Sequence, residues 1–221
     1  MTYFIHFWEL VLGTILALLP VINPLASAPA FLAMTDRLSP AQRHRQLLVA
    51  CVYMVVILVT FLVGGSLIMG FFGISIPGLR IAGGLMVAGI GSSMLVSTPA
   101  AVGEADIASP ERDIAFTPLA MPMLSGPGAI AVTLGFTSLA SGWLDYVAVM
   151  LGIVAMAVIA YTTLRLSGSI VRVIGQVGMN ALTKVMGFLL LCIGIQFIVN
   201  GVLGIATDPV LLRSIRDSLH R

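Results

Sequence analysis

The sequence predicts an all-α integral membrane protein with six transmembrane helices, arranged as two inverted three-helix repeats with interrupted first helices. Three observations support this fold class. Hydrophobic residues make up 59% of the chain and charged residues only 9%, whereas a soluble domain carries about 25% charged residues. Six charge-free runs are long enough to cross a bilayer, and one proline-rich motif occurs twice. We therefore expect a single membrane domain over residues 1–221.

The expected spans are the runs between successive charged residues. A helix needs roughly 17–25 residues to cross the hydrocarbon core of a membrane. Six runs reach that length, at 10–35, 46–79, 81–103, 114–144, 146–164 and 185–207. In the second run, FFGISIPG at 71–78 predicts a turn. Segment 167–183 is too polar for a span, and we expect a loop or an interfacial helix there.

Local signals give helix starts and an orientation. Ser39 with Pro40 in SPAQ, and Ser109 with Pro110 in SPER, are typical of an N-cap followed by proline at the first helical position. Lys and Arg are enriched in cytoplasmic loops. The loops on one expected side carry seven, and the other side carries four: Arg37, Arg43, Arg45, Arg112, Arg165, Arg172 and Lys184 against Arg80, Arg213, Arg216 and Arg221. This bias predicts both termini outside.

The motif P-x3-P-x2-S-x-P occurs in PVINPLASAPAF, from Pro20, and in PLAMPMLSGPGA, from Pro118, with an offset of 98 residues. The stretches GLMVAGIG and GFLLLCIG also match, with an offset of 103. One small insertion accounts for the difference. The chain is thus expected to contain repeats at about 1–97 and 110–207. Because three spans is an odd number, the second repeat must enter the membrane from the opposite side.

The two proline-rich breaks are the expected binding site. An ordinary proline kink is the alternative, but paired interrupted helices are common at transporter sites near the membrane midplane. Half-helix ends offer amides to an anion and carbonyls to a cation, and a zwitterionic amino acid needs both. Expected binding residues on the breaks are Asn23, Pro24, Ser27, Ala28, Pro29, Pro122, Ser125, Gly126, Pro127 and Gly128. The hydroxyls of Ser27 and Ser125 are the expected side-chain ligands.

Few other residues suggest a role in transport. Gln196 and Asn200 share one helix face and could bond across the bundle or contact substrate; Gln196 is included among the expected substrate-binding residues. Arg80 either reaches the head groups or, with Asn200, gates the site. Gly84 and Ala88 predict close helix packing. No Asp or Glu lies deep in a span, so the coupling ion could be a proton or sodium.

Several function classes are not indicated. The chain has no G-x-S-x-G, HExxH or P-loop motif, and its three histidines lack metal-ligand spacing. We therefore expect no enzymatic activity, metal or cofactor. Cys51 and Cys192 lie in apolar runs and are expected to be small buried hydrophobes. The net charge of +2 without a basic, aromatic-rich cluster gives no indication of a nucleic-acid partner.

The chain resembles the MarC family of six-span inner-membrane proteins. The resemblance rests on INPLASAPAFLAMT, FGISIPGLRIAGGLMVAGIG, PLAMPMLSGPGAIA and MGFLLLCIGIQFIVNG, and covers nearly the whole length. The family includes SnatA-type transporters of small neutral amino acids. The resemblance therefore implies a multi-pass protein of the inner membrane that transports glycine or alanine, with the lipid bilayer and the amino acid as its partners.

Two other functions stay open. An exporter of drugs or other amphipathic compounds would need a roomy, aromatic-lined cavity, whereas aromatic residues make up only 7% of the chain. A non-transporting membrane scaffold would not need two matched helix breaks. The sequence is compatible with either direction of transport and with any oligomeric state.

Overall fold

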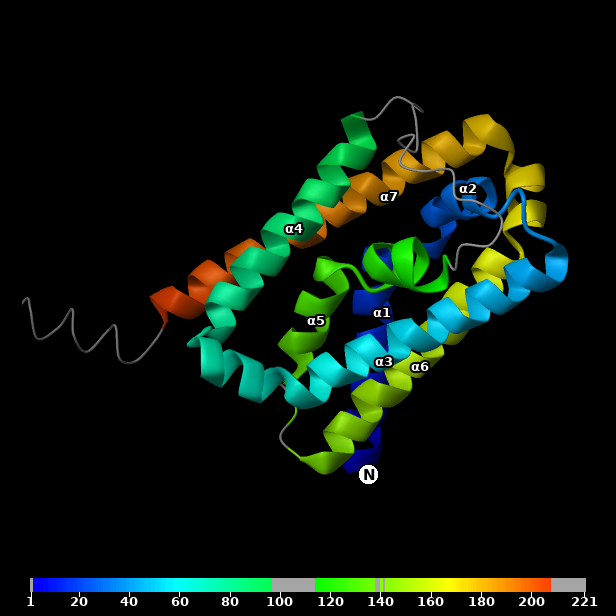
Figure 1. Ribbon diagram of the computed structural model, residues 1–221. Helices are drawn as coiled ribbons and strands as arrows, with labels where there is room; N and C mark the ends of the chain where they lie inside the picture. Colours follow the sequence, from blue (N-terminus) through cyan, green and yellow to red (C-terminus); the bar gives the residue numbers. More distant parts are fainter. Residues whose placement is uncertain (1, 97–113, 138–139, 141, 208–221) are drawn as a thin grey trace, which may run out of the picture.

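The computed structural model describes residues 2–96, 114–137, 140 and 142–207, and these residues form helices without a strand (Figure 1). The all-α prediction is confirmed. The elements are α1 (Thr2–Ile22), α2 (Pro24–Met34), α3 (Pro40–Phe72), α4 (Ile76–Val96), the π-helical segment η1 (Ala115–Leu124), α5 (Pro127–Thr137), α6 (Trp143–Arg165) and α7 (Ser167–Ala206).

Five of the described helices are long and apolar enough to cross a membrane, namely α1, α3, α4, α6 and α7. The run 114–144, expected to be one interrupted span, divides into η1 and α5, so the six-span count stays a prediction. Proline lacks an amide hydrogen and cannot continue a helical hydrogen-bond ladder, and this run contains Pro118, Pro122 and Pro127. The run 10–35 divides likewise between α1 and α2. Interrupted helices are thus present where the sequence predicts them.

Most local signals act as expected. Ser39 caps α3: its Oγ accepts a bond from the amide of Gln42, and the Gln42 side chain accepts one from the Ser39 amide. Gly73, at φ 64°, ends α3 and confirms the predicted turn. The SPER start lies outside the described residues. Segment 167–183 is helical rather than a loop and continues into α7 through a bend at Gly175, whose φ is 70°.

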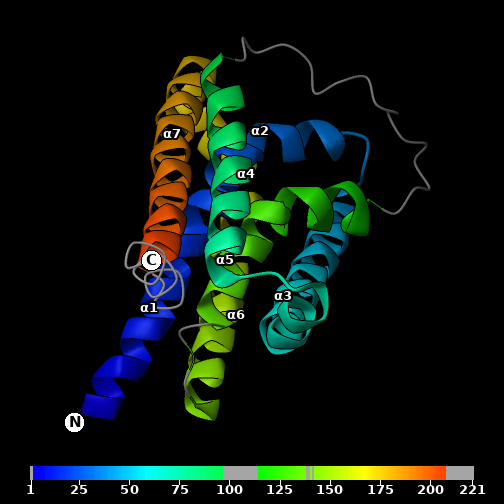
Figure 2. The ribbon, with the colours of Figure 1, turned by 90° about the vertical axis from the view of Figure 1, so that its left-hand side faces the viewer.

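The long helices form two pairs with α1 beside them. Figure 1 shows α4 next to α7, and α3 next to α6. The start of α3, the end of α6 and the start of α7 gather at one end of the molecule, away from the N-terminus. Figure 2 shows α2 and η1 running across the direction of α4 and α7. The two short segments therefore lie at an angle to the long helices and pack against them, α2 against α7 and η1 against α3.

Helices α4 and α7 pack backbone against backbone along a line of glycines. A Cβ built at Gly84 would lie 2.9 Å from the backbone nitrogen of Ile198, and one at Gly91 would lie 2.5 Å from that of Leu191. Such distances leave no room for a side chain, so the helices are as close as their backbones allow. The predicted packing through Gly84 and Ala88 is confirmed, because Ala88 in turn contacts Gly194 of α7.

The contacts between α4 and α7 come in related pairs. When 103 is added to the residue number on α4 and subtracted from the residue number on α7, a contact turns into another contact of the same seam. Gly84 beside Ile198 becomes Gly187 beside Leu95, and a Cβ at Gly187 indeed meets the backbone nitrogen of Leu95. A two-fold relation between two copies of one unit produces this pattern. It supports the predicted repeat for the third helix of each half, while the six-span count and the inversion stay predictions.

The helix starts also favour the offset of 103 over that of 98. Helices α2 and α5 both have 11 residues and begin at Pro24 and Pro127, and α3 and α6 begin at Pro40 and Trp143. The motif-based pairing of Pro24 with Pro122 therefore does not match equivalent places in the fold. The small insertion lies before α5, where η1 accommodates the extra residues.

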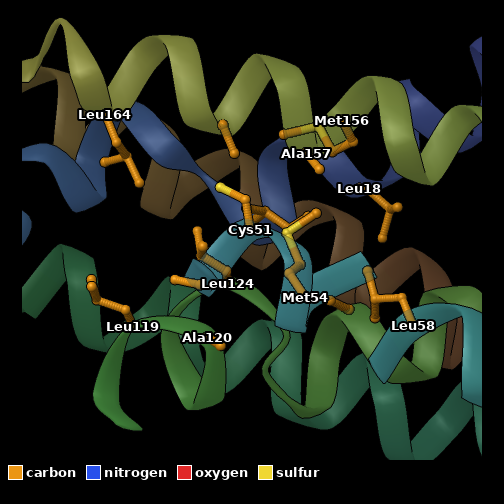
Figure 3. Packing of buried hydrophobic residues seen from close by; sticks show 14 of the residues in the cluster. Leu18, Cys51, Met54, Leu58, Leu119, Ala120, Leu124, Met156, Ala157 and Leu164 are labelled. Atoms are coloured by element: carbon orange, nitrogen blue, oxygen red, sulfur yellow. The ribbon is translucent and has the colours of Figure 1, made fainter. Parts of the chain in front are cut away.

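The apolar core holds η1 in place. Its residues Leu119 and Leu124 are fully buried, and Figure 3 shows them facing Cys51 and Met54 of α3, with Met156 of α6 on the far side. Cys51 is buried as expected, whereas Cys192 is exposed on the outer surface of α7. That surface is suited to contact with lipid, so a small apolar side chain is compatible with it.

Candidate functional site: two facing helix breaks

The first break is a single residue, Asn23, between α1 and α2. Its backbone is left-handed, with φ 45° and ψ 60°, a conformation that asparagine tolerates better than most residues. The Oδ1 atom accepts a bond from the amide of Ala26 at 3.3 Å and so caps α2. Pro24 then starts the helix and, having no amide hydrogen, cannot donate to the carbonyl of Pro20.

The side-chain amide of Asn23 is the unusual polar group at this break. The residue is 6% exposed, and its Nδ2 atom is buried without a hydrogen-bond acceptor among the described residues. An unpaired buried donor typically costs about 1–3 kcal/mol, and native proteins keep few of them. Such a group is therefore expected to donate to a ligand that occupies the break.

The expected site residues that follow Asn23 lie on α2. Ala28 is fully buried, while Ser27 and Pro29 are half-buried. The amide of Ser27 donates to the carbonyl of Asn23 at 3.1 Å, but its hydroxyl bonds no residue that the structure describes. Ser27 thus keeps its hydroxyl available one turn after the break.

The second break extends over the whole of η1. Thr117 and Met121 have extended backbones, with ψ of 121° and 122°, because each precedes a proline and proline disfavours the helical region for the residue before it. The amide of Ser125 donates to the carbonyl of Ala120, five residues earlier, at 2.8 Å. The prolines at 118 and 122 therefore turn an expected helix into a wide, irregular coil.

Ser125 is tied into this coil. It is fully buried, and its Oγ donates to the carbonyl of Ala120 at 2.7 Å. The hydroxyl hydrogen thus satisfies a backbone acceptor within the break, and the role of Ser125 as a side-chain ligand stays a prediction. Gly126 follows half-buried, and Pro127 starts α5 at an exposed position.

The structure brings the two breaks together. A Cβ built at Gly128, in the first turn of α5, would lie 3.1 Å from Cγ1 of Val21 and 3.0 Å from Cγ2 of Val87. Val21 is two residues before Asn23, so the start of α5 packs against the last turn of α1, next to the residue where α2 begins. Two helix N-termini provide partial positive charge, and the end of α1 provides carbonyls. The junction thus presents opposite partial charges within a small volume.

Two valines at this junction, Val21 and Val87, carry no signal in the sequence. They are apolar residues in apolar runs, and only the tertiary packing places them against Gly128. The small size of Gly128, which the sequence does single out, is what lets α5 approach them.

The remaining candidates lie elsewhere on the bundle. Gln196 and Asn200 are exposed on α7, where Gln196 Nε2 donates to Asn200 Oδ1 at 2.9 Å. They face away from the line of glycines that contacts α4. Arg80 is half-buried near the start of α4 and bonds no described residue. In the described part of the chain, no group of three or more His, Cys, Asp or Glu side chains could hold a metal.

These features define a transmembrane, all-α protein with two helix breaks packed against each other. A family model described as MarC family integral membrane protein matches residues 8–206, and the chain belongs to the MarC family.

Curated relatives agree with this assignment. Inner membrane protein MarC from Citrobacter koseri is 43% identical over 205 residues, which cover 86% of this chain and 93% of the relative. Inner membrane protein MarC from Escherichia coli strain K12 matches with the same identity and coverage. No solved structure matches the chain. The chain is therefore an inner-membrane protein of this family.

Proposed function

We propose that the protein is a secondary transporter of a small neutral amino acid, glycine or alanine, and not an enzyme. The substrate binds where the two helix breaks meet, and transport proceeds by alternating access. The observation that carries this proposal is the buried, unpaired amide of Asn23 at the junction of two helix starts. A carboxylate would accept from this amide and from the backbone amides of Leu25 and Gly128, which follow the starting prolines of α2 and α5.

The ammonium end of the substrate has a matching surface. Pro24 leaves the carbonyl of Pro20 without its helical donor, and carbonyls at a helix C-terminus attract a cation. Within this proposal the half-buried hydroxyl of Ser27 adds an acceptor or donor one turn along α2. An amino acid whose two charges are joined by a single carbon matches a junction that offers both poles.

The size of the junction favours a small side chain. Its walls near α5 are Gly128, Val21 and Val87, and Ala28 on α2 is fully buried. An added Cβ at Gly128 would already be 3.0–3.1 Å from the two valines, so little free space exists there. Glycine and alanine fit this description better than a bulky amphipathic drug would.

The contact between α4 and α7 offers a basis for alternating access. Its contacts exchange under a shift of 103 residues, as in Gly84 with Ile198 and Gly187 with Leu95. In transporters with repeats, one repeat rocks against the other around a fixed site. The α4–α7 contact joins a helix of the first expected repeat to a helix of the second, so such rocking would take place across it.

Reconstitution into proteoliposomes tests the proposal. Labelled glycine or alanine should accumulate when a pH gradient or a sodium gradient is imposed, and the gradient that drives uptake identifies the coupling ion. Liposomes without protein are the first control, and liposomes carrying the Asn23→Gly variant are the second. Movement of an amphipathic dye without glycine uptake would favour a drug exporter. A folded protein that moves neither would favour a scaffold.

A further inference from the structure

A cleft of about 510 Å³ lies at the end of the bundle opposite the N-terminus, where α3 begins and α6 ends. It is separate from the two helix breaks, since its walls come from the first turns of α3, the last residue of α6 and the middle of α2. The proposed transport function makes no use of it.

Three basic side chains line this cleft: Arg43 and His44 from α3 and Arg165 from α6. No described acidic residue lines it. The Arg43 Nη2 atom donates to the carbonyl of Thr35 at 3.0 Å, but its Nε is buried without a partner among the described residues. His44 pairs with the hydroxyl of Tyr161, at 2.8 Å from Nδ1. Cationic and donor groups thus converge, and the described residues that line the cleft include no balancing anion.

The floor of the cleft is apolar. Phe31 and Leu47 line it, and each is only 1% exposed. The cleft is thus closed by buried apolar residues at its base and is basic at its rim, which matches the anionic head of a lipid.

The height of the cleft along the bundle agrees with such a ligand. Helices α3 and α6 are both long and apolar enough to span the membrane, and the cleft lies where one starts, at Pro40, and the other ends, at Arg165. The ends of spanning helices lie among the lipid head groups. Lys and Arg next to such ends attract anionic lipids, and arginine binds phosphate through paired, charge-assisted hydrogen bonds.

We propose that this cleft binds the phosphate of an anionic phospholipid, whose acyl chains extend from the cleft into the surrounding membrane. Arg165 and Arg43 hold the phosphate from opposite walls, and His44 adds a hydrogen-bond donor from the α3 side. The bound lipid would join the end of α6 to the start of α3, in addition to the His44–Tyr161 bond.

Lipid binding to the full-length protein in detergent tests the site. Native mass spectrometry would measure retention of phosphatidylglycerol against phosphatidylcholine, and thermal unfolding would measure stabilisation by each. Arg165→Gln is the main variant, because the Arg165 side chain is exposed and makes no hydrogen bond or ion pair with a described residue. Arg45→Gln is the matched control, since Arg45 is an exposed arginine on α3 that does not line the cleft.

We expect the wild-type protein to retain phosphatidylglycerol in preference to phosphatidylcholine. Arg165→Gln should weaken this retention about tenfold, as expected for loss of one charge-assisted contact, whereas Arg45→Gln should change it less than twofold. Equal losses in both variants, or no preference in the wild type, would overturn the site. Equal occupation by inorganic phosphate without lipid would overturn the lipid as its occupant. Because binding is measured without transport, these results do not depend on the proposed function.

Discussion

The two helix breaks differ in length and in what they leave unsatisfied. The first is one left-handed residue, Asn23, whose buried amide has no acceptor among the described residues. The second occupies the 10 residues of η1, and at its end Ser125 donates two bonds to Ala120. The first break therefore offers a polar group to a ligand, whereas at the second break Ser125 is bonded within the break and Gly128 lets α5 approach Val21 and Val87. This contrast implies a division of roles between recognition of charge and selection by size.

The largest effect is expected from removing the amide at the first break. Asn23→Gly keeps the left-handed backbone, which glycine adopts freely, and deletes only the side chain. A hydrogen bond to a charged group is worth about 1.5–3 kcal/mol, so glycine affinity should fall about 10- to 100-fold. Equilibrium binding by calorimetry, together with uptake, measures this change.

Asn23→Ala separates the effect of backbone strain from the effect of losing the side-chain amide. It removes the same amide but also places an alanine at positive φ, which adds about 1 kcal/mol of strain. The two variants should therefore bind the substrate equally poorly, and the Asn23→Ala protein should unfold at a lower temperature than the Asn23→Gly protein. Unchanged affinity in Asn23→Gly would remove the first break from the binding site and, with it, the contrast between the breaks.

A smaller effect is expected from adding a methyl group at Gly128, beside the second break. Gly128→Ala places a Cβ 3.0–3.1 Å from the ends of two valine side chains, which can shift by a few tenths of an ångström. A single methyl group in an apolar pocket typically changes discrimination by about tenfold. Uptake of alanine should therefore fall about tenfold more than uptake of glycine.

Gly135→Ala on the same helix is the matched control. A Cβ built there meets nothing within 4 Å, so the ratio of alanine uptake to glycine uptake should match that of the wild type. If both variants changed this ratio equally, the effect would come from α5 as a whole and not from space at the junction.

What the sequence can predict here follows from the range of the interactions. The start of α3 is predictable because Ser39, Pro40 and Gln42 form a cap from neighbouring residues. Paired breaks are predictable because proline acts on its own backbone. Residues before Pro118 and Pro122 become extended, and each proline also removes one donor, but whether the chain then spans or coils depends on packing against α3. Sequence alone therefore counts a sixth span where the structure has η1 and α5.

The site was predictable to a similar degree. Asn23 and Gly128 stand out because asparagine and glycine are unusual beside prolines in an apolar run. Val21 and Val87 could not be found, since their role depends on a contact between distant segments. Segment 167–183 was open between a loop and an interfacial helix because Arg172 makes it too polar for a span, and the structure selects the helix, with Arg172 exposed and Met179 buried.

Ser27 and Ser125 test the contrast between the two breaks with single hydroxyl groups, so the expected changes are smaller. Ser125→Ala should lower the free energy of unfolding by about 1 kcal/mol, because it removes a buried bond to Ala120, while glycine affinity holds. Ser27→Ala should leave stability within about 0.5 kcal/mol and weaken glycine binding. Thermal unfolding and calorimetry on both variants measure the two quantities. A pattern with the roles exchanged would show that the second break, and not the first, provides the hydroxyl ligand.

The smallest effect is expected at Gln196 and Asn200, whose side chains bond each other on the exposed face of α7. Polar pairs in membrane proteins contribute about 0.6 kcal/mol on average, so a double-mutant cycle of Gln196→Ala and Asn200→Ala should give a coupling energy of that order. Because this face points away from α4 and from the junction at Gly128, each single variant should keep glycine uptake within about twofold of the wild type, a difference of less than half a kcal/mol. A much larger loss in Gln196→Ala, with stability preserved, would mean that substrate contacts α7 as well. Recognition of the charged substrate would then be shared between the first break and α7, and the two breaks alone would not account for substrate binding.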